Sequence, residues 1–150
     1  MEGIASYILI GILAFLQLRP AGWWTTSKVR KSNCIIGIVI SLTPCFIFIS
    51  LLISFFPIPG SMQALFPLIK QFIPEILHLI LGILIYRNNS RVFQFFVVTL
   101  FVDILSTGYA LTLPVLVDGF YFGILLQVIT YLMLGTYLWR MQKLGYLGKQ

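Results

Sequence analysis

The chain has 150 residues, of which 59% are hydrophobic and only 9% are charged, and its formal net charge is +6. Soluble domains carry about 25% charged residues, so this composition cannot cover a water-facing surface and excludes an ordinary soluble protein. The length fits a single domain. The intervals between its apolar segments are short and leave no room for a separate soluble head.

Five apolar segments follow one another along the chain, each near the ~20 residues that a helix needs to cross the hydrocarbon core. Proline, glycine, asparagine and charged residues concentrate between them, which is typical of loops. The sequence therefore predicts an all-α fold, a polytopic transmembrane helical bundle of about five spans. It forms one integral membrane domain over residues 1–150. The expected spans are residues 3–18, 34–56, 65–86, 92–113 and 120–139.

The third span is expected to be interrupted by proline. Pro67 and Pro74 lie within it, with Lys70 between them. A proline inside a helix removes one backbone hydrogen bond and kinks the helix, which membranes tolerate where neighbouring helices satisfy the freed carbonyl. We therefore expect residues 61–72 to form an interfacial or broken segment ahead of the span proper.

Lysine and arginine positions predict the orientation of the bundle. Nine of the ten fall in the first loop, the third loop and the C-terminal tail, which share one side of the membrane if there are five spans. The opposite side receives Glu2, Asp118 and at most Lys70. The positive-inside rule then places the N-terminus outside and the C-terminus in the cytoplasm. The nine basic residues are Arg19, Lys28, Arg30, Lys31, Arg87, Arg91, Arg140, Lys143 and Lys149.

This orientation also predicts location and partners. We expect an integral protein of the cytoplasmic (inner) membrane of a bacterium, with the lipid bilayer as its first partner. Topology explains the basic charge without nucleic acid, since no aromatic-basic recognition module is present. Five spans enclose little volume, so a homo-oligomer or a membrane protein partner is compatible with the size of the chain.

Three ionisable residues fall near the predicted middle of the membrane. Glu75 and His78 are three apart on the third span and so share a helical face, while Asp103 lies near the midpoint of the fourth span. Burying such groups in lipid costs roughly 2.5–3.5 kcal/mol each on insertion scales. They therefore need partners or a function.

Small polar side chains extend this layer. Ser106 and Thr107 share a face with the aspartate of the fourth span, at i+3 and i+4. The fifth span places Gln127, Thr130 and Tyr131 at similar depth. The residues that we predict to bind a proton or a ligand are Glu75, His78, Asp103, Ser106, Thr107 and Gln127.

The cluster has two interpretations that stay open. Ionisable residues inside spans commonly mark ion pathways or proton relays, and an imidazole titrates near neutral pH. The first interpretation is therefore a small membrane protein that binds or transports a proton, a cation or a small ligand. The alternative is a polar network that only holds helices together. The chain would then be a non-catalytic accessory, assembly or immunity-type membrane interaction protein.

No motif predicts catalysis or a cofactor. The chain lacks G-x-S-x-G, H-E-x-x-H and a phosphate-binding glycine loop, so no catalytic residue is assigned; an intramembrane enzyme would need His78 and a carboxylate to line a pocket. Glu75 and His78 match half of a di-iron carboxylate motif, but the chain has one histidine and the motif needs two. A mononuclear site from Glu75, His78 and Asp103 stays geometrically open, and the prediction is no metal.

Overall fold

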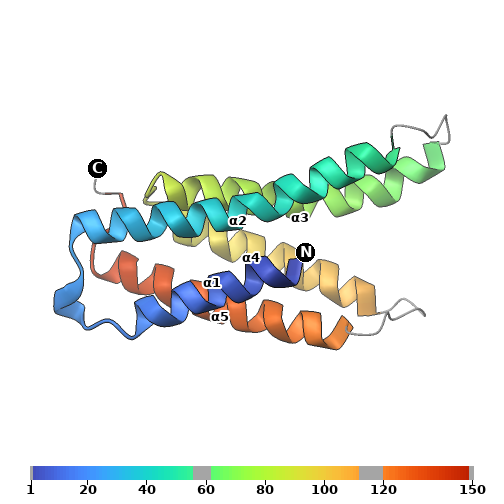
Figure 1. The fold of residues 1–150 in the computed structure, drawn as a ribbon. Coiled ribbons are helices and arrows are strands. Elements are labelled where there is room, and N and C mark those ends of the chain that lie inside the picture. The colour runs from blue at the N-terminus through green and yellow to red at the C-terminus, as the bar shows by residue number, and fades with distance from the viewer. Residues whose placement is uncertain (1, 56–61, 112–119, 149–150) are drawn as a thin grey trace.

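Helices make up the fold of this chain in the computed structural model (Figure 1). The structure describes residues 2–55, 62–111 and 120–148, and within these ranges it contains five α-helices, one 3₁₀ turn and no strand. The all-α prediction is therefore confirmed over the described residues. The helices are α1 (Glu2–Gln17), α2 (Thr26–Phe55), α3 (Met62–Tyr86), α4 (Val92–Leu111) and α5 (Phe120–Lys143), and η1 (Ala21–Trp23) is the 3₁₀ turn.

Three of the described helices are long and apolar enough to cross a membrane. Their apolar stretches are Thr26–Ser50, Val92–Tyr109 and Tyr121–Lys143. Ile4–Gln17 in α1 and Phe72–Tyr86 in α3 form shorter apolar stretches. At about 1.5 Å per residue, the 16 residues of α1 extend about 24 Å, which is less than the ~30 Å of a hydrocarbon core.

Consecutive helices run in opposite directions, and each packs against its neighbour in sequence (Figure 1). The α2–α3 pair has the most extensive contact, and α1 packs against both α2 and α5, which closes the bundle. In Figure 1 the α2–α3 pair reaches past the other helices at the upper right, and the N-terminus lies near the middle of the bundle. The short α1 therefore covers only one half of the molecule.

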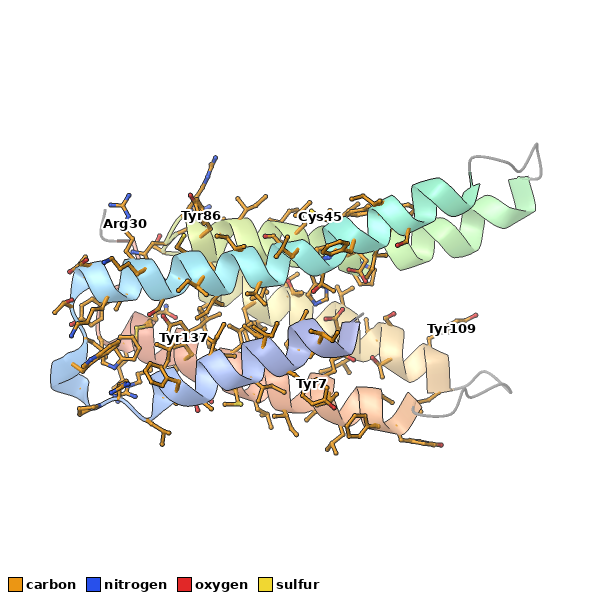
Figure 2. The ribbon with its side chains drawn as sticks, in the orientation of Figure 1. Tyr7, Arg30, Cys45, Tyr86, Tyr109 and Tyr137 are labelled. Atoms are coloured by element: carbon orange, nitrogen blue, oxygen red, sulfur yellow. The ribbon has the colours of Figure 1, made fainter. Side chains whose placement is uncertain are left out.

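The described core lies in the half that α1 covers. Its side chains come from α1, the first half of α2, the second half of α3, the start of α4 and the second half of α5. Tyr137 lies between the helices there, whereas Tyr7 and Tyr109 point outward (Figure 2). Beyond this core, most described side chains of the second half of α4 and the first half of α5 are exposed.

A buried polar network joins the loops at the core end of the bundle. Asn33 on α2 donates to the Asn88 side chain at 2.9 Å and accepts from the Tyr137 hydroxyl at 2.7 Å. Asn88, between α3 and α4, donates to the Tyr146 carbonyl at 3.0 Å, and the Tyr146 hydroxyl donates to the Trp24 carbonyl at 2.8 Å. The first loop, the third loop and the C-terminal tail therefore meet at one end.

The basic residues of these segments consequently gather at that end, but five of them lie in helices. Arg140 and Lys143 lie in the last turn of α5 rather than in the tail, and the other three lie in α2. Helix α2 begins at Thr26, so Lys28, Arg30 and Lys31 occupy its first turns rather than the first loop where the sequence placed them. The reason is local: the Thr25 hydroxyl accepts from the Lys28 backbone N–H at 3.3 Å, as an N-cap does. The side chains of Glu2 and Lys70, and residues 118 and 149, lie outside the described part of the chain.

Prolines are accommodated inside continuous helices. Helix α3 runs without a break from Met62 to Tyr86, so the interruption expected at Pro67 and Pro74 is not confirmed. Helix α2 likewise contains Pro44, which is buried.

The close contact of α2 with α3 depends on two glycines. A Cβ atom at Gly37 would lie 2.6 Å from the Gly82 carbonyl oxygen and 2.8 Å from the Tyr86 backbone nitrogen. A Cβ atom at Gly82 would lie 2.8 Å from the Gly37 carbonyl oxygen. Small residues allow this approach of two backbones, which is typical of helix pairs in membranes.

Gly82→Ala is expected to destabilise the protein by about 1–3 kcal/mol, the usual cost of overpacking a tight site. The nearest atom is the Ser41 hydroxyl oxygen, but the next two, the Gly37 carbonyl oxygen at 2.8 Å and the Ser41 backbone nitrogen at 3.1 Å, belong to the backbone of α2 and cannot rotate away as a side chain would. Unfolding by sodium dodecyl sulfate, followed by circular dichroism, measures the effect. Gly11→Ala is the matched control, since a Cβ atom at Gly11 meets nothing within 4 Å. Equal stability of the two variants would contradict the contact.

Candidate functional site

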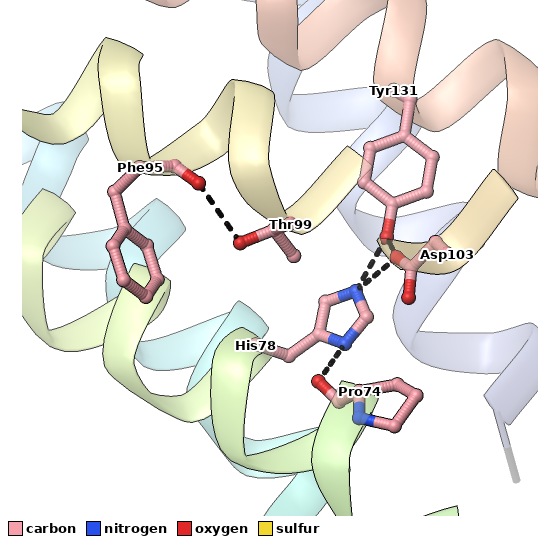
Figure 3. Close-up of polar contacts among 6 residues, drawn as sticks. All are labelled: Pro74, His78, Phe95, Thr99, Asp103 and Tyr131. Atoms are coloured by element: carbon pink, nitrogen blue, oxygen red, sulfur yellow. Dashed lines mark hydrogen bonds and ion pairs between the residues drawn. The ribbon is translucent and has the colours of Figure 1, made fainter. Parts of the chain in front are cut away.

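Helices α3, α4 and α5 each bring one polar side chain to a common point (Figure 3). His78 Nε2 lies 3.0 Å from Asp103 Oδ2. The Tyr131 hydroxyl donates a hydrogen bond to the same Oδ2 atom and is also within hydrogen-bond distance of His78 Nε2. We call His78, Asp103 and Tyr131 the polar triad. It links α3, α4 and α5, and so joins α3 to α5, which are not neighbours in sequence.

The other ring nitrogen of the imidazole fixes its tautomer. His78 Nδ1 lies 2.8 Å from the Pro74 carbonyl oxygen, one turn earlier on α3. A carbonyl oxygen only accepts, so Nδ1 must carry a proton whether the ring is neutral or charged. In the neutral ring the Nε2 lone pair would then face a carboxylate oxygen at 3.0 Å. A proton between Nε2 and Asp103, or from the Tyr131 hydroxyl, relieves that repulsion.

Of His78 and Asp103, Asp103 is the more deeply buried. Its side chain is 5% exposed, against 24% for His78. A buried carboxylate needs hydrogen bonds or a counter-charge, because the cost of removing it from water is several kcal/mol. The Tyr131 hydroxyl supplies a hydrogen bond, and a protonated His78 supplies a counter-charge, on the same oxygen atom.

A groove of about 900 Å³ lies between α4 and α5. Its lining is mostly aliphatic and aromatic, and its main polar side chains, Asp103, Thr107, Gln127 and Tyr131, come from both helices. Phe96 and Gly135 hold the two helices in contact at one point, where a Cβ atom at Gly135 would lie 3.0 Å from the Phe96 ring. Asp103 and Tyr131 therefore belong both to the polar triad and to the groove wall.

The predicted site residues separate into four groups. His78 and Asp103 meet directly, and Thr107 and Gln127 line the groove. Glu75 lies one turn before His78 on α3 and is half-buried. Ser106 is exposed and does not line the groove, so the structure does not bring it to the triad.

Tyr131 completes the site and was not among the predicted binding residues. It lies four residues after Gln127 on α5, so the two share a helical face, and this spacing was the available signal. Thr99, one turn before Asp103, is buried but donates its hydroxyl to the Phe95 carbonyl at 3.0 Å within α4.

The donor set does not form a metal centre. Among the described side chains, no group of three or more His, Cys, Asp or Glu residues lies close enough to hold a metal ion. Glu75, His78 and Asp103 are all described, so the mononuclear site that the sequence left open is not assembled.

The chemistry available is proton sharing and polar anchoring in apolar surroundings. No protein-family model matches the chain, and neither a curated protein nor a solved structure does. The functional argument therefore starts from the triad and the groove themselves. Their shared element is Asp103, whose carboxylate contacts His78 and which is also one of the residues that line the groove.

Proposed function

We propose that the chain is an integral membrane protein that binds a small ligand in the α4–α5 groove and a proton in the polar triad. Asp103 is the residue common to both. The observation that carries the proposal is that Asp103, whose buried carboxylate contacts His78, is also one of the residues that line a groove of about 900 Å³.

The membrane assignment is supported by length, composition and surface. Three described helices are apolar and long enough to cross a bilayer. Large hydrophobic side chains are exposed on all five described helices, for example Phe15 on α1, Phe46 on α2 and Phe101 on α4. In water, exposed apolar patches of this kind drive association. In a bilayer the same surface is satisfied by lipid.

Ligand binding is supported by the size and lining of the groove. Small-molecule sites have volumes of about 300–1,000 Å³ and combine apolar walls with a few placed polar groups. The groove has this composition: Asp103, Gln127 and Tyr131 lie among aliphatic and aromatic side chains. Proton binding is supported by the orientation of His78, whose Nε2 atom points at the carboxylate while Nδ1 is held by Pro74.

A second candidate function rests on the uncovered halves of α4 and α5. Ile104 and Leu111 on α4 and Val128 on α5 are exposed on these halves and line the groove. A partner helix seated between α4 and α5 would cover them, and the chain would then be a non-catalytic accessory or assembly protein. In that case the triad serves to hold helices together.

A thermal-stability screen of the purified protein in a non-ionic detergent tests the proposal. The panel contains hydrophobic small molecules that are neutral, anionic or cationic. A ligand present at 100 times its Kd stabilises by about 2.7 kcal/mol, which raises the Tm of a chain of this size by about 5–10 °C. We expect at least one class to do so in the wild type and to have no effect on Asp103→Asn.

Ser106→Ala is the matched control, because Ser106 lies on the same helix but is exposed outside the groove. It should respond to the ligand as the wild type does. A panel in which no class of compound stabilises the wild type would contradict ligand binding and favour the accessory role.

A further inference from the structure

The polar groups of the groove are suited to a positive charge. Asp103 offers a carboxylate, and Thr107 and Gln127 offer oxygen atoms that accept hydrogen bonds. The described residues that line the groove include no lysine, arginine or histidine. A bound anion would therefore meet a carboxylate and find no counter-charge in the wall.

Aromatic rings line the same groove, and one of them, Tyr131, donates its hydroxyl to the Asp103 carboxylate. Phe96 and Tyr131 both line the groove, and their ring centroids are 6.0 Å apart. The face of an aromatic ring attracts a cation within about 6 Å. The carboxylate and the rings thus favour the same sign of charge, while the aliphatic wall favours an apolar body.

We infer that the groove binds a hydrophobic organic cation, and that this cation and a proton on His78 compete for Asp103. This inference rests on the proposed function, because it names the ligand class of the same groove. The lipid of a surrounding bilayer fits less well: an acyl chain brings no positive charge to Asp103, and an anionic headgroup is repelled by its carboxylate.

The competition follows from the shared oxygen atom. When His78 is protonated, its Nε2–H donates to Asp103 Oδ2 at 3.0 Å and neutralises the carboxylate. A ligand cation next to Asp103 in the groove then gains little binding free energy from the carboxylate. When the ring is neutral, the carboxylate is available to the ligand. Binding of the cation therefore releases a proton, and a lower pH weakens binding.

The surroundings of His78 determine which groups take part. Among the described residues, the titratable groups that face it are Asp103 from α4, the Tyr131 phenol from α5 and Glu75 from α3 itself. Glu75 is not part of the groove wall, so the ligand does not displace it. The ligand and the protonated imidazole therefore compete for the carboxylate of Asp103 and not for that of Glu75.

Three phenyl-substituted probes of similar size and different charge test the inference. Tetraphenylphosphonium is a hydrophobic cation with no proton to lose, tetraphenylborate is its anionic counterpart, and triphenylphosphine oxide is neutral. Titration calorimetry on the purified full chain in a non-ionic detergent gives Kd at pH 6, 7 and 8. We expect binding of the cation alone, with a Kd that falls as pH rises, by up to about tenfold per pH unit where one proton leaves per cation bound.

Variants assign the effect to residues. Asp103→Asn should weaken binding of tetraphenylphosphonium about thirtyfold or more, as loss of a buried charge partner does. His78→Gln should keep binding but lose its dependence on pH. Gly108→Leu, where a Cβ atom meets nothing within 4 Å, should fill the groove and block binding without touching the triad. Gly123→Leu on α5 is equally open and lies outside the groove, so it should bind as the wild type does.

The outcomes separate the inference from the proposed function. Binding of the anion or of the neutral probe in place of the cation overturns the inference and leaves ligand binding in the groove intact. The same holds if His78→Gln retains the full pH dependence, because His78 is then not the competing group. If none of the three probes binds, the inference is wrong, and the wider panel decides the proposed function. If no probe binds the wild type and Gly108→Leu changes the oligomeric state, the groove binds a helix of another subunit. That result overturns both the inference and the proposed function.

Discussion

His78→Leu is expected to destabilise the folded protein by about 3–5 kcal/mol, and adding Asp103→Leu is expected to restore part of that loss. The reason is that removing one partner of a buried pair leaves the other charge uncompensated, whereas an apolar replacement of both partners removes that cost. Asp103 is the more enclosed partner, with a side chain 5% exposed. Among the described residues, the Tyr131 hydroxyl is then the remaining partner of the carboxylate oxygen in His78→Leu.

A double-mutant cycle measures this coupling. The free energies of unfolding of the wild type, of both single variants and of the double variant are obtained by titration with sodium dodecyl sulfate. Contacting residues give interaction energies of about 0.5–3 kcal/mol, while distant ones add. Strict additivity of the two substitutions would contradict the contact between His78 and Asp103. Tyr131→Phe is a useful control, since it removes one hydrogen bond from the triad and keeps the pair.

The same cycle weighs the two interpretations of the triad. If the double variant is as stable as the wild type, the fold does not need the pair, which favours a role in binding. If the double variant is much less stable than the wild type, the triad is a structural network between α3, α4 and α5. Gly108→Leu gives an independent measurement with the groove probes, because it fills the groove without replacing a residue of the triad.

The helical nature of the fold could be predicted because apolar segments and their breakers are local features of the sequence. The start of α2 could not be placed as well. Thr25, Thr26 and Ser27 are good capping residues, but they precede a basic segment that hydropathy assigns to a loop. The helix therefore begins at Thr26, and its first turns carry Lys28, Arg30 and Lys31.

The site could be predicted in part. The depths of His78 and Asp103 follow from the midpoints of their spans, and depth alone brought them to one level. Which side chains meet at that level depends on how the helices are rotated, and the sequence does not state this. For this reason the sequence did not predict Tyr131 as a binding residue, although it belongs to the triad, and it did predict Ser106, which is exposed. The groove depends on contacts still further from local sequence, such as that of Gly135 with Phe96.

A reporter fused after the C-terminus is expected to lie wholly in the cytoplasm of a bacterial host. The basic residues of the first loop, the start of α2, the third loop and the end of α5 meet at one end of the bundle, where Arg140 donates to the Gln17 and Arg19 carbonyls. Positive charge near the ends of spans is retained on the cytoplasmic side. A green fluorescent protein fusion should therefore fluoresce, and an alkaline phosphatase fusion at the same point should be inactive.

Charge removal at the start of α2 is expected to disturb this orientation. Lys28, Arg30 and Lys31 are exposed there, so their replacement by glutamine removes three positive charges without opening the core. Phosphatase activity should then appear at the C-terminus. Lys28→Arg with Lys31→Arg is the matched control: it keeps the charge while altering the Lys28 Nζ contact with the Trp23 carbonyl, 3.2 Å away. If charge sets the orientation, the arginine variant keeps it and the glutamine variant loses it. If the contact with Trp23 sets it, both variants lose it.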